Sequence, residues 1–169
     1  MNTVETERLN IREITSKDLI DLRLVLSDAE VMKYSIVGVH TDEDIKKYII
    51  NCQQQYCTNG YGQWAMFLKE NDKFVGVCGL NNHVVENHDL LHVSYRLVSS
   101  QQGKGFASEA TVGITKFCKR ELNLNTVAVL IDPENKPSLK VAQNAGFLFV
   151  KSSEIQGFKV DLYEVNLQG

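Results

Sequence analysis

Two glycines and an alanine lie within five positions of the stretch SSQQGKGFASEA, residues 99–110. These residues, Gly103, Gly105 and Ala107, come just before a run with helical periodicity. The first backbone N–H groups of a helix have no partner inside it, and the helix dipole adds about half a positive charge there. Glycines at 103 and 105 allow positive φ and let phosphate oxygens reach several amides. The stretch therefore indicates an anion site, with a tight strand-to-helix turn as the alternative interpretation.

Two common phosphate-binding patterns do not fit this stretch. A Walker loop requires a glycine where Val98 stands, and a serine or threonine where Gly105 follows Lys104. A dinucleotide fingerprint requires a third glycine or alanine where Ser108 stands, and an acidic residue about 20 positions later, whereas Asp132 is farther along the chain. These departures disfavour a nucleotide-dependent dehydrogenase.

The histidines and cysteines do not predict a metal site. His83, His88 and His92 lie in NNHVVENHDLLH, which is typical of a polar hairpin entering a strand. The cysteines lack the paired C-x-x-C spacing of a zinc site, and we expect them to be reduced packing residues. They are Cys52, Cys57, Cys78 and Cys118.

The composition is that of an ordinary globular chain. With 169 residues, 43% of them hydrophobic, the chain suits one domain, residues 1–169. A net charge of -3 argues against a nucleic-acid partner, because that affinity comes from clustered Lys and Arg. No segment approaches the roughly 20 apolar residues that cross a bilayer, and the N-terminus lacks an apolar stretch of signal-peptide length. We therefore expect no membrane partner and a cytoplasmic location.

The periodicity of apolar residues predicts the elements that position the glycine turn. Their order, β-α-α-β-β-β-α-β-α-β-β, predicts an α/β fold, in the sense of α+β mixed, with one mixed sheet and helices on both faces. The pairing should be parallel where the helix that follows the glycines crosses over. The expected strands are 8–14, 62–70, 73–80, 90–98, 126–132, 147–153 and 158–167, and the expected helices are 16–28, a segment that starts after Thr41, 106–121 and one that starts at 136.

The pattern Q-x-x-G-x-A, formed by Gln102, Gly105 and Ala107, resembles the acyl-CoA pyrophosphate loop of the GNAT superfamily of N-acetyltransferases. TERLNIRE, GKGFASEA and NKPSLKVAQNAGF are similar to the ribosomal-protein N-terminal (alanine/serine) acetyltransferase branch. The resemblance implies a single mixed, mostly antiparallel sheet, splayed at the cofactor site. The splay should lie between the strand ending near Val98 and the strand at 126–132.

The resemblance also implies acetyl-CoA as co-substrate and no metal. Amides of the glycine turn would hold the pyrophosphate, backbone groups at the end of the preceding strand would pair with pantetheine, and Asn135 would lie beside the pantetheine arm. A helix or turn cap is the alternative for Asn135. The expected cofactor-binding residues are Leu97, Val98, Gln102, Gly103, Lys104, Gly105, Phe106, Ala107 and Asn135.

The implied reaction is direct attack of a primary amine on the acetyl thioester in a ternary complex. Many superfamily members carry a tyrosine as thiolate proton donor where Val141 stands, so Ser138 is the predicted substitute, with a first-turn cap as the alternative. His92 stands where many branch members have a glutamate, and it could accept the amine proton or simply be a packed residue. Glu109 and Tyr95 are weaker candidates.

The acceptor pocket is predicted to include Tyr34, His40 and Trp64, each of which could instead be a core or rim residue. The acceptor itself stays open between a protein N-terminal α-amine and a small-molecule amine, and a homodimer is possible. A non-catalytic CoA- or acyl-CoA-binding module is the alternative function, because the superfamily tyrosine and glutamate are both replaced.

Overall fold

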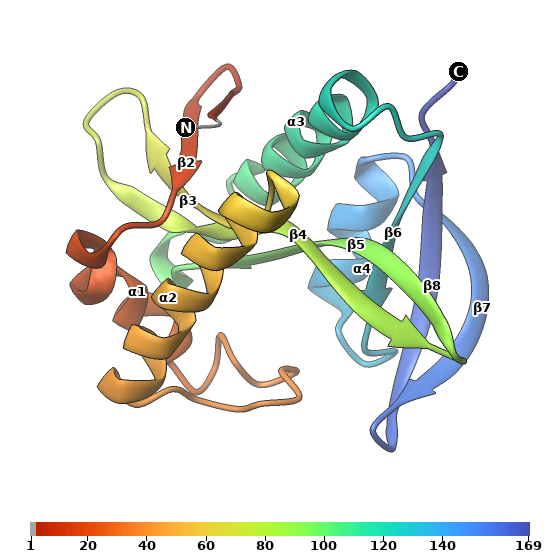
Figure 1. The fold of residues 1–169 in the computed structure, drawn as a ribbon, viewed down its shortest axis with the longest axis horizontal. Coiled ribbons are helices and arrows are strands. Elements are labelled where there is room, and N and C mark those ends of the chain that lie inside the picture. The colour runs from red at the N-terminus through yellow and green to blue at the C-terminus, as the bar shows by residue number, and fades with distance from the viewer. Residues whose placement is uncertain (1–2) are drawn as a thin grey trace.

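The computed structural model describes residues 3–169 as one eight-stranded sheet in the order β1-β2-β3-β4-β5-β6-β8-β7, with four α-helices (Figure 1). The mixed, mostly antiparallel sheet that the sequence predicted is confirmed. The helices are α1 (Leu19–Leu26), α2 (Asp42–Asn59), α3 (Phe106–Glu121) and α4 (Lys136–Asn144), and short 3-10 turns are η1 (Ser16–Asp18) and η2 (Ser99–Gln101). The strands are β1 (Val4–Glu5), β2 (Leu9–Glu13), β3 (Gln63–Leu68), β4 (Phe74–Val85), β5 (His88–Leu97), β6 (Thr126–Ile131), β7 (Leu148–Ile155) and β8 (Phe158–Asn166).

Local signals fix the ends of the helices. Thr41 and Asp44 form a capping box at the start of α2, and Gly60 ends that helix in the left-handed conformation. Gly105, also left-handed, directly precedes α3, which begins and ends as its periodicity predicts. Because these signals lie within a few residues of each boundary, the helices follow closely from the sequence.

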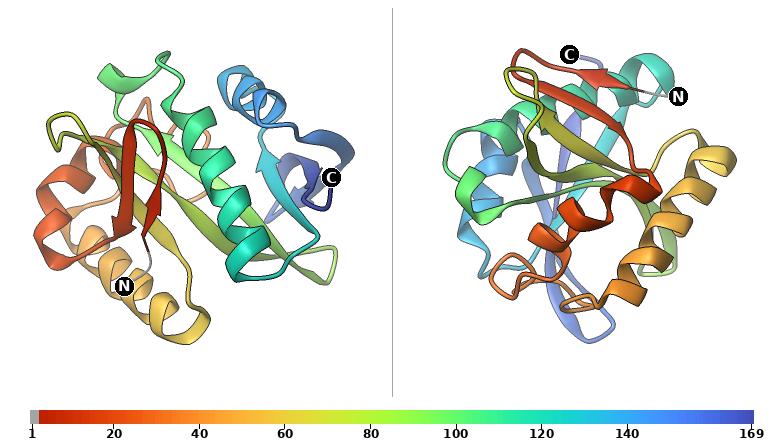
Figure 2. Two further views of the ribbon diagram at one scale, coloured as in Figure 1. Left: turned by 90° about the horizontal axis from the view of Figure 1, so that it is seen from above. Right: turned by 90° about the vertical axis from the view of Figure 1, so that its left-hand side faces the viewer.

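Helices cover both faces of the sheet. Residues of α1 and α2 form one buried cluster with Ala65, Phe67 and Val77, whereas α3 and Ala142 of α4 belong to another on the opposite face. Figure 2 shows α3 and α4 on one side of the sheet and α1 and α2 on the other. Successive side chains of a strand point to opposite faces, so each strand residue faces one of these two layers.

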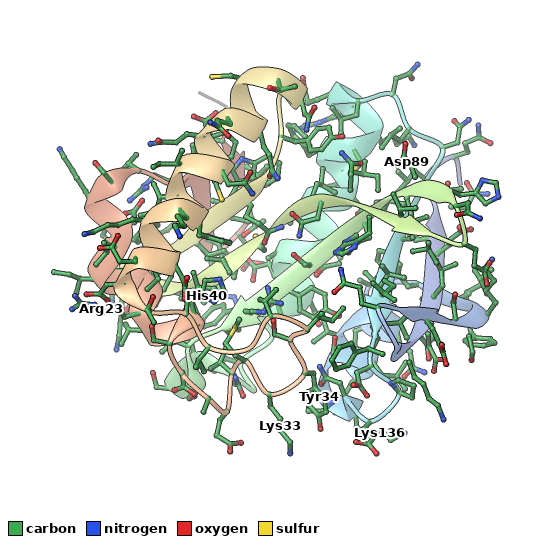
Figure 3. The ribbon with its side chains drawn as sticks, turned by 60° about the horizontal axis from the view of Figure 1, so that its bottom comes forward. Arg23, Lys33, Tyr34, His40, Asp89 and Lys136 are labelled. Carbon is green, nitrogen blue, oxygen red and sulfur yellow. The ribbon has the colours of Figure 1, made fainter. Side chains whose placement is uncertain are left out.

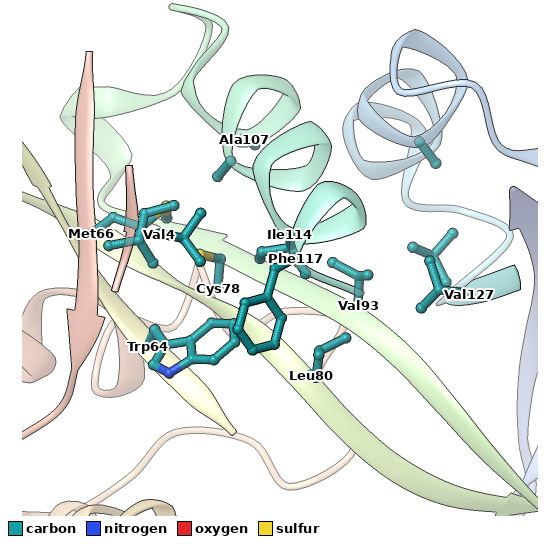
Figure 4. Packing of buried hydrophobic residues seen from close by; sticks show 14 of the residues in the cluster. Val4, Trp64, Met66, Cys78, Leu80, Val93, Ala107, Ile114, Phe117 and Val127 are labelled. Atoms are coloured by element: carbon teal, nitrogen blue, oxygen red, sulfur yellow. The ribbon is translucent and has the colours of Figure 1, made fainter. Parts of the chain in front are cut away.

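Trp64 lies in the core beneath α3. Its ring meets that of Phe117 edge to face at 5.1 Å between centroids, and the side chain is 1% exposed (Figure 4). The expectation that Trp64 lines the acceptor pocket is therefore wrong. Its position in β3 directs the indole toward α3, because the neighbouring Ala65 packs toward α1 and α2.

The sheet is splayed where the resemblance implied. β5 pairs with β6 in parallel at only two positions, His92 with Ala128 and Val93 with Val129. Residues 94–97 of β5 are paired with β4 on one side and, among residues 3–169, have no strand partner on the other. This edge leaves backbone groups free for a ligand that lies between β5 and β6.

The hairpin of β4 and β5 is longer than the sequence suggested. β4 extends to Val85, and the chain turns at Glu86 and Asn87, both with positive φ, as in a tight two-residue hairpin turn. The extension places Asn81 and His83 in the strand, across from residues 90–92 of β5. The predicted polar hairpin is confirmed.

Candidate active site

The glycine turn leaves the start of α3 uncovered. Gly103 and Gly105 have φ of 75° and 83°, a conformation that side chains with a Cβ rarely adopt. The first N–H groups of an α-helix have no intrahelical partners, and at Gly105 no side chain among residues 3–169 caps those of α3. A Cβ at Gly103 would meet nothing within 4 Å, and one at Gly105 would lie 3.3 Å from an Arg8 nitrogen. The turn therefore has both the donors and the open space that a diphosphate requires.

Arg8, in the connection between β1 and β2, contacts this turn. Its guanidinium donates to the Lys104 carbonyl at 3.0 Å and to Glu109 at 2.7 Å, and lies 4.4 Å from the centre of the Phe106 ring. Glu109 also accepts from the Thr6 hydroxyl at 2.5 Å. Burial alone would raise the pKa of Glu109, but the hydrogen bonds from Thr6 and Arg8 lower it overall. Glu109 thus supports the turn, and Arg8 adds a positive charge beside it.

Backbone groups at the end of β5 face two directions. The Val98 N–H donates to the Val75 carbonyl of β4 at 2.9 Å, so it is not available to a ligand. Leu97 faces the other way, toward the gap, where its carbonyl accepts from the Gln102 side chain at 3.2 Å. Of the two residues predicted to pair with pantetheine, Leu97 has backbone groups that face the gap, and Val98 has an N–H that is bonded to β4. Lys104 reaches Gln101 at 3.3 Å.

Two hydroxyl groups meet across the opening of the sheet. Tyr95 of β5 donates to the Ser138 carbonyl at 2.8 Å, and the Ser138 hydroxyl donates to the Tyr95 oxygen at 3.1 Å. Burial raises the pKa of Tyr95 to about 12. The Asn135 side chain accepts from the Ser138 N–H at 3.2 Å, so Asn135 caps α4. The structure therefore pairs the predicted Ser138 with a tyrosine that the sequence ranked lower.

His92 is a buried, neutral side chain. It is 7% exposed, and neither ring nitrogen has a hydrogen-bond partner among residues 3–169. Burial, followed by the charge of His83, whose ring centroid is 5.1 Å away, lowers the pKa of His92 to about 4. The Val93 backbone opposes this shift, and the charge of Arg96 adds a smaller lowering. At neutral pH the imidazole can accept a proton, but it does so weakly. The part of the chain that the structure describes holds no group of three or more metal-ligating side chains.

The burial of His92 makes stability depend on pH. Between the folded pKa of about 4 and the reference value of about 6.5, the unfolded chain binds the proton and the folded chain does not. The free energy of unfolding therefore rises with pH across this window, and the full contribution of His92 is present above it. We expect His92 to account for about 3 kcal/mol of unfolding free energy lost from pH 6.5 to pH 4, measured by urea unfolding at several pH values.

The matched variants are His92→Phe and His88→Gln. The first removes the buried titration and should flatten the pH dependence by that amount, whereas the second changes an exposed hairpin residue and should keep the original slope. Identical slopes in the protein and in His92→Phe would contradict the assignment.

The loop before α2 lies over the face of the sheet that α1 and α2 cover, opposite to α3. Its Tyr34 hydroxyl donates to the Glu134 carbonyl at 3.3 Å, which joins this loop to the segment before α4 (Figure 3). His40 lies edge to face with Tyr48 at 6.0 Å. The predicted residues Tyr34 and His40 are thus on one loop, but only His40 lines the depression of about 390 Å³ found there. Its lining residues are Val37, Val39, His40, Asp44, Lys47, Tyr48 and Asn51.

The fold agrees with comparisons to known proteins. The family described as "Acetyltransferase (GNAT) domain" matches residues 8–148, so the chain belongs to the GNAT acetyltransferases. It is 31% identical to the uncharacterized N-acetyltransferase p20 of Bacillus licheniformis over 99% of this chain and 96% of that protein. A GNAT acetyltransferase from Bacillus anthracis superposes with a TM-score of 0.85 at 24% identity, covering 99% of this chain and 100% of that one.

Another structural neighbour is a ribosomal-protein acetyltransferase. RimL, a ribosomal L7/L12 α-N-protein acetyltransferase solved with coenzyme A, superposes with a TM-score of 0.78 at 17% identity, covering 98% of each chain. At this identity the likeness shows the fold alone. No helix among residues 3–169 has the length and apolar composition to cross a membrane.

Proposed function

We propose that this acetyltransferase uses acetyl-CoA and transfers the acetyl group directly to a primary amine in a ternary complex. The observation that carries the proposal is the uncapped start of α3, with two left-handed glycines and an open space above its amides. Such a turn can hold an anion, and the diphosphate of a CoA thioester is an anion of this kind.

The residues that would hold the cofactor lie around this turn and along the open edge of β5. Amides of residues 103–107 would bind the pyrophosphate, with Arg8 close enough to add charge. Leu97 would present backbone groups to the pantetheine arm once the Gln102 side chain releases the carbonyl. When bound, acetyl-CoA supplies an activated acetyl group, so the chain needs no nucleophile of its own.

The acceptor amine must be neutral to attack. At pH 7 an α-amino group with a pKa of about 7.8 is neutral roughly one time in seven, and a lysine amine near 10.4 about once in 2,500. The difference is worth about 3.5 kcal/mol. A site whose candidate base, His92, has a pKa of about 4 therefore suits an α-amine or another weakly basic amine better than lysine.

The departing thiolate needs a proton, and the hydroxyl pair of Ser138 and Tyr95 is placed to provide one. Both groups border the gap between β5 and α4. The pair takes the place of the superfamily tyrosine that is replaced by Val141. Its presence favours a catalytic protein over the alternative, a CoA- or acyl-CoA-binding module without catalysis.

The acceptor belongs to one of two classes, a protein N-terminal α-amine or a small-molecule amine. The likeness to RimL, whose name records a ribosomal α-N-protein acceptor, and the TERLNIRE and NKPSLKVAQNAGF motifs support the ribosomal-protein branch. A homodimer and a cytoplasmic location stay predictions.

Two measurements separate the proposed functions. Thermal unfolding with acetyl-CoA, CoA and NAD tests the cofactor, since a ligand at a hundredfold its dissociation constant adds about 2.7 kcal/mol of stability. Release of CoA thiol against a panel of amines, including alanine- and serine-starting peptides, tests catalysis. Stabilisation by CoA without thiol release from any amine would favour the binding module, and stabilisation by NAD alone would overturn both.

A further inference from the structure

Arg96 lies on the acceptor side of the sheet. Its neighbours Tyr95 and Leu97 pack with the cluster beneath α3, so the side chain of Arg96 points to the opposite face. Val98, two residues later on the same face, packs with the α1 and α2 cluster. Arg96 therefore faces the helices and loop that carry Tyr34 and His40.

Arg96 carries a charge with no counter-charge. None of the ion pairs among residues 3–169 includes it, so no carboxylate of these residues lies within 4 Å of its guanidinium. The side chain is partly buried, and burial lowers the pKa of Arg96. A charge that is removed from water without a partner costs free energy, which a bound anion would restore.

Other buried polar atoms share this face. The Gln63 amide nitrogen is buried without a hydrogen-bond partner among residues 3–169. The Tyr48 hydroxyl is buried with, among these residues, only the Cys52 sulfur as a partner, and the positive charge of Arg96 acts on it electrostatically. Gln63 is held in place because its side-chain oxygen accepts from Ser94 at 3.0 Å. Ser94 is two residues before Arg96 and points the same way. Arg96 and the Gln63 amide thus offer hydrogen-bond donors that have no carboxylate partner among residues 3–169, and Tyr48 lies close enough to Arg96 to interact with its charge.

We propose that Arg96 binds a carboxylate of the acceptor, so that the substrate is an amine that also carries a carboxylate. The proposal rests on the proposed acetyl transfer and specifies its substrate class. The guanidinium fork matches the two oxygens of a carboxylate. A phosphate of the cofactor is the less suitable anion, because the turn that holds it precedes α3, on the other face of the sheet from Arg96.

The test compares matched substrates that differ only in this charge. Free α- and ω-amino acids are assayed beside their carboxamides, and amidated peptides that start with aspartate beside those that start with asparagine. We expect kcat/KM to be about 10- to 100-fold higher for the acid in at least one of these two sets. The set that responds identifies a free amino acid or an acidic peptide as the source of the carboxylate. Equal kcat/KM for every acid and amide would overturn the proposal.

Variants and a binding measurement complete the experiment. Arg96→Gln should remove the acid preference, Arg96→Lys should keep part of it, and the control Arg120→Gln, an exposed change in the last turn of α3, should keep all of it. Arg96→Gln should leave the Kd for CoA unchanged, and a weaker Kd would assign Arg96 to the cofactor phosphates and overturn the proposal.

The N-acetyl derivatives of the same amino acids and carboxamides are then tested as product ligands by thermal unfolding. The acids should raise the Tm of the protein but not of Arg96→Gln. This shift is independent of turnover, so its presence without acetylation of any amine would support the anion site and contradict the proposed reaction. If neither the Tm shift nor acetylation of any amine is observed, the anion site and the proposed reaction are both overturned.

Discussion

Gly105→Val is expected to weaken acetyl-CoA binding by about 100-fold or more, since each lost hydrogen bond to a charged group is worth about 1.5–3 kcal/mol. Gly105 directly precedes α3 with φ of 83°. A β-branched side chain there is strained, would press on Arg8, and would cover amides that face the predicted phosphates. The Kd for CoA, measured by isothermal titration calorimetry, is the direct readout.

The strain itself has a matched control in Gly60→Val. Gly60 ends α2 with φ of 77°, and a Cβ there meets nothing within 4 Å. Both variants force a valine into the left-handed region, so both should lose similar backbone stability, but only Gly105→Val should lose CoA. Equal CoA affinity in the two folded variants would show that the pyrophosphate does not lie at this turn.

Ser138→Ala and Tyr95→Phe should each lower kcat about 100-fold, the lower end of the range for general acid catalysis. The two hydroxyls are hydrogen-bonded to each other, so removal of either breaks the same donor. The double variant should be little worse than the more damaging single variant, because groups that act as a unit are not additive. Steady-state kinetics, with the Kd for CoA measured in parallel, tests this.

Tyr61→Phe is the control for the loss of a tyrosine hydroxyl. Tyr61 lies in the connection between α2 and β3, and its hydroxyl accepts from the Asn82 side chain at 3.1 Å. It should keep full kcat. Additive losses for Ser138 and Tyr95 would show separate roles, and unchanged kcat in both would remove the pair from the reaction.

Local signals explain why much of the fold was predictable. The bare turn, the start of α3 and the hairpin near Gly157 each depend on residues within a few positions, where glycine conformation and helix capping decide the structure. The splay depended instead on resemblance. No local sequence signal indicated it, because a contact of two residue pairs between β5 and β6 leaves no local signature.

The remaining features depend on which face of a strand a residue occupies. β3 is buried on both faces, so its sequence shows no alternation and the direction of Trp64 could not be predicted. The contact between Tyr95 and Ser138 joins residues 43 positions apart and needs α4 in place. Arg96 gave no signal, because an arginine in a half-buried strand is ordinary until its face and the lack of a carboxylate are known.

The narrow contact between β5 and β6 has a consequence for how the ligand gap can vary. Val93 and Val129, one of its two pairs, are both buried in the core beneath α3. Because this contact is so short, we expect a larger or smaller apolar side chain at either position to shift β6 and β8 relative to β5. The width of the opening is therefore set by core residues, and it can change while every residue predicted to hold the thioester stays the same.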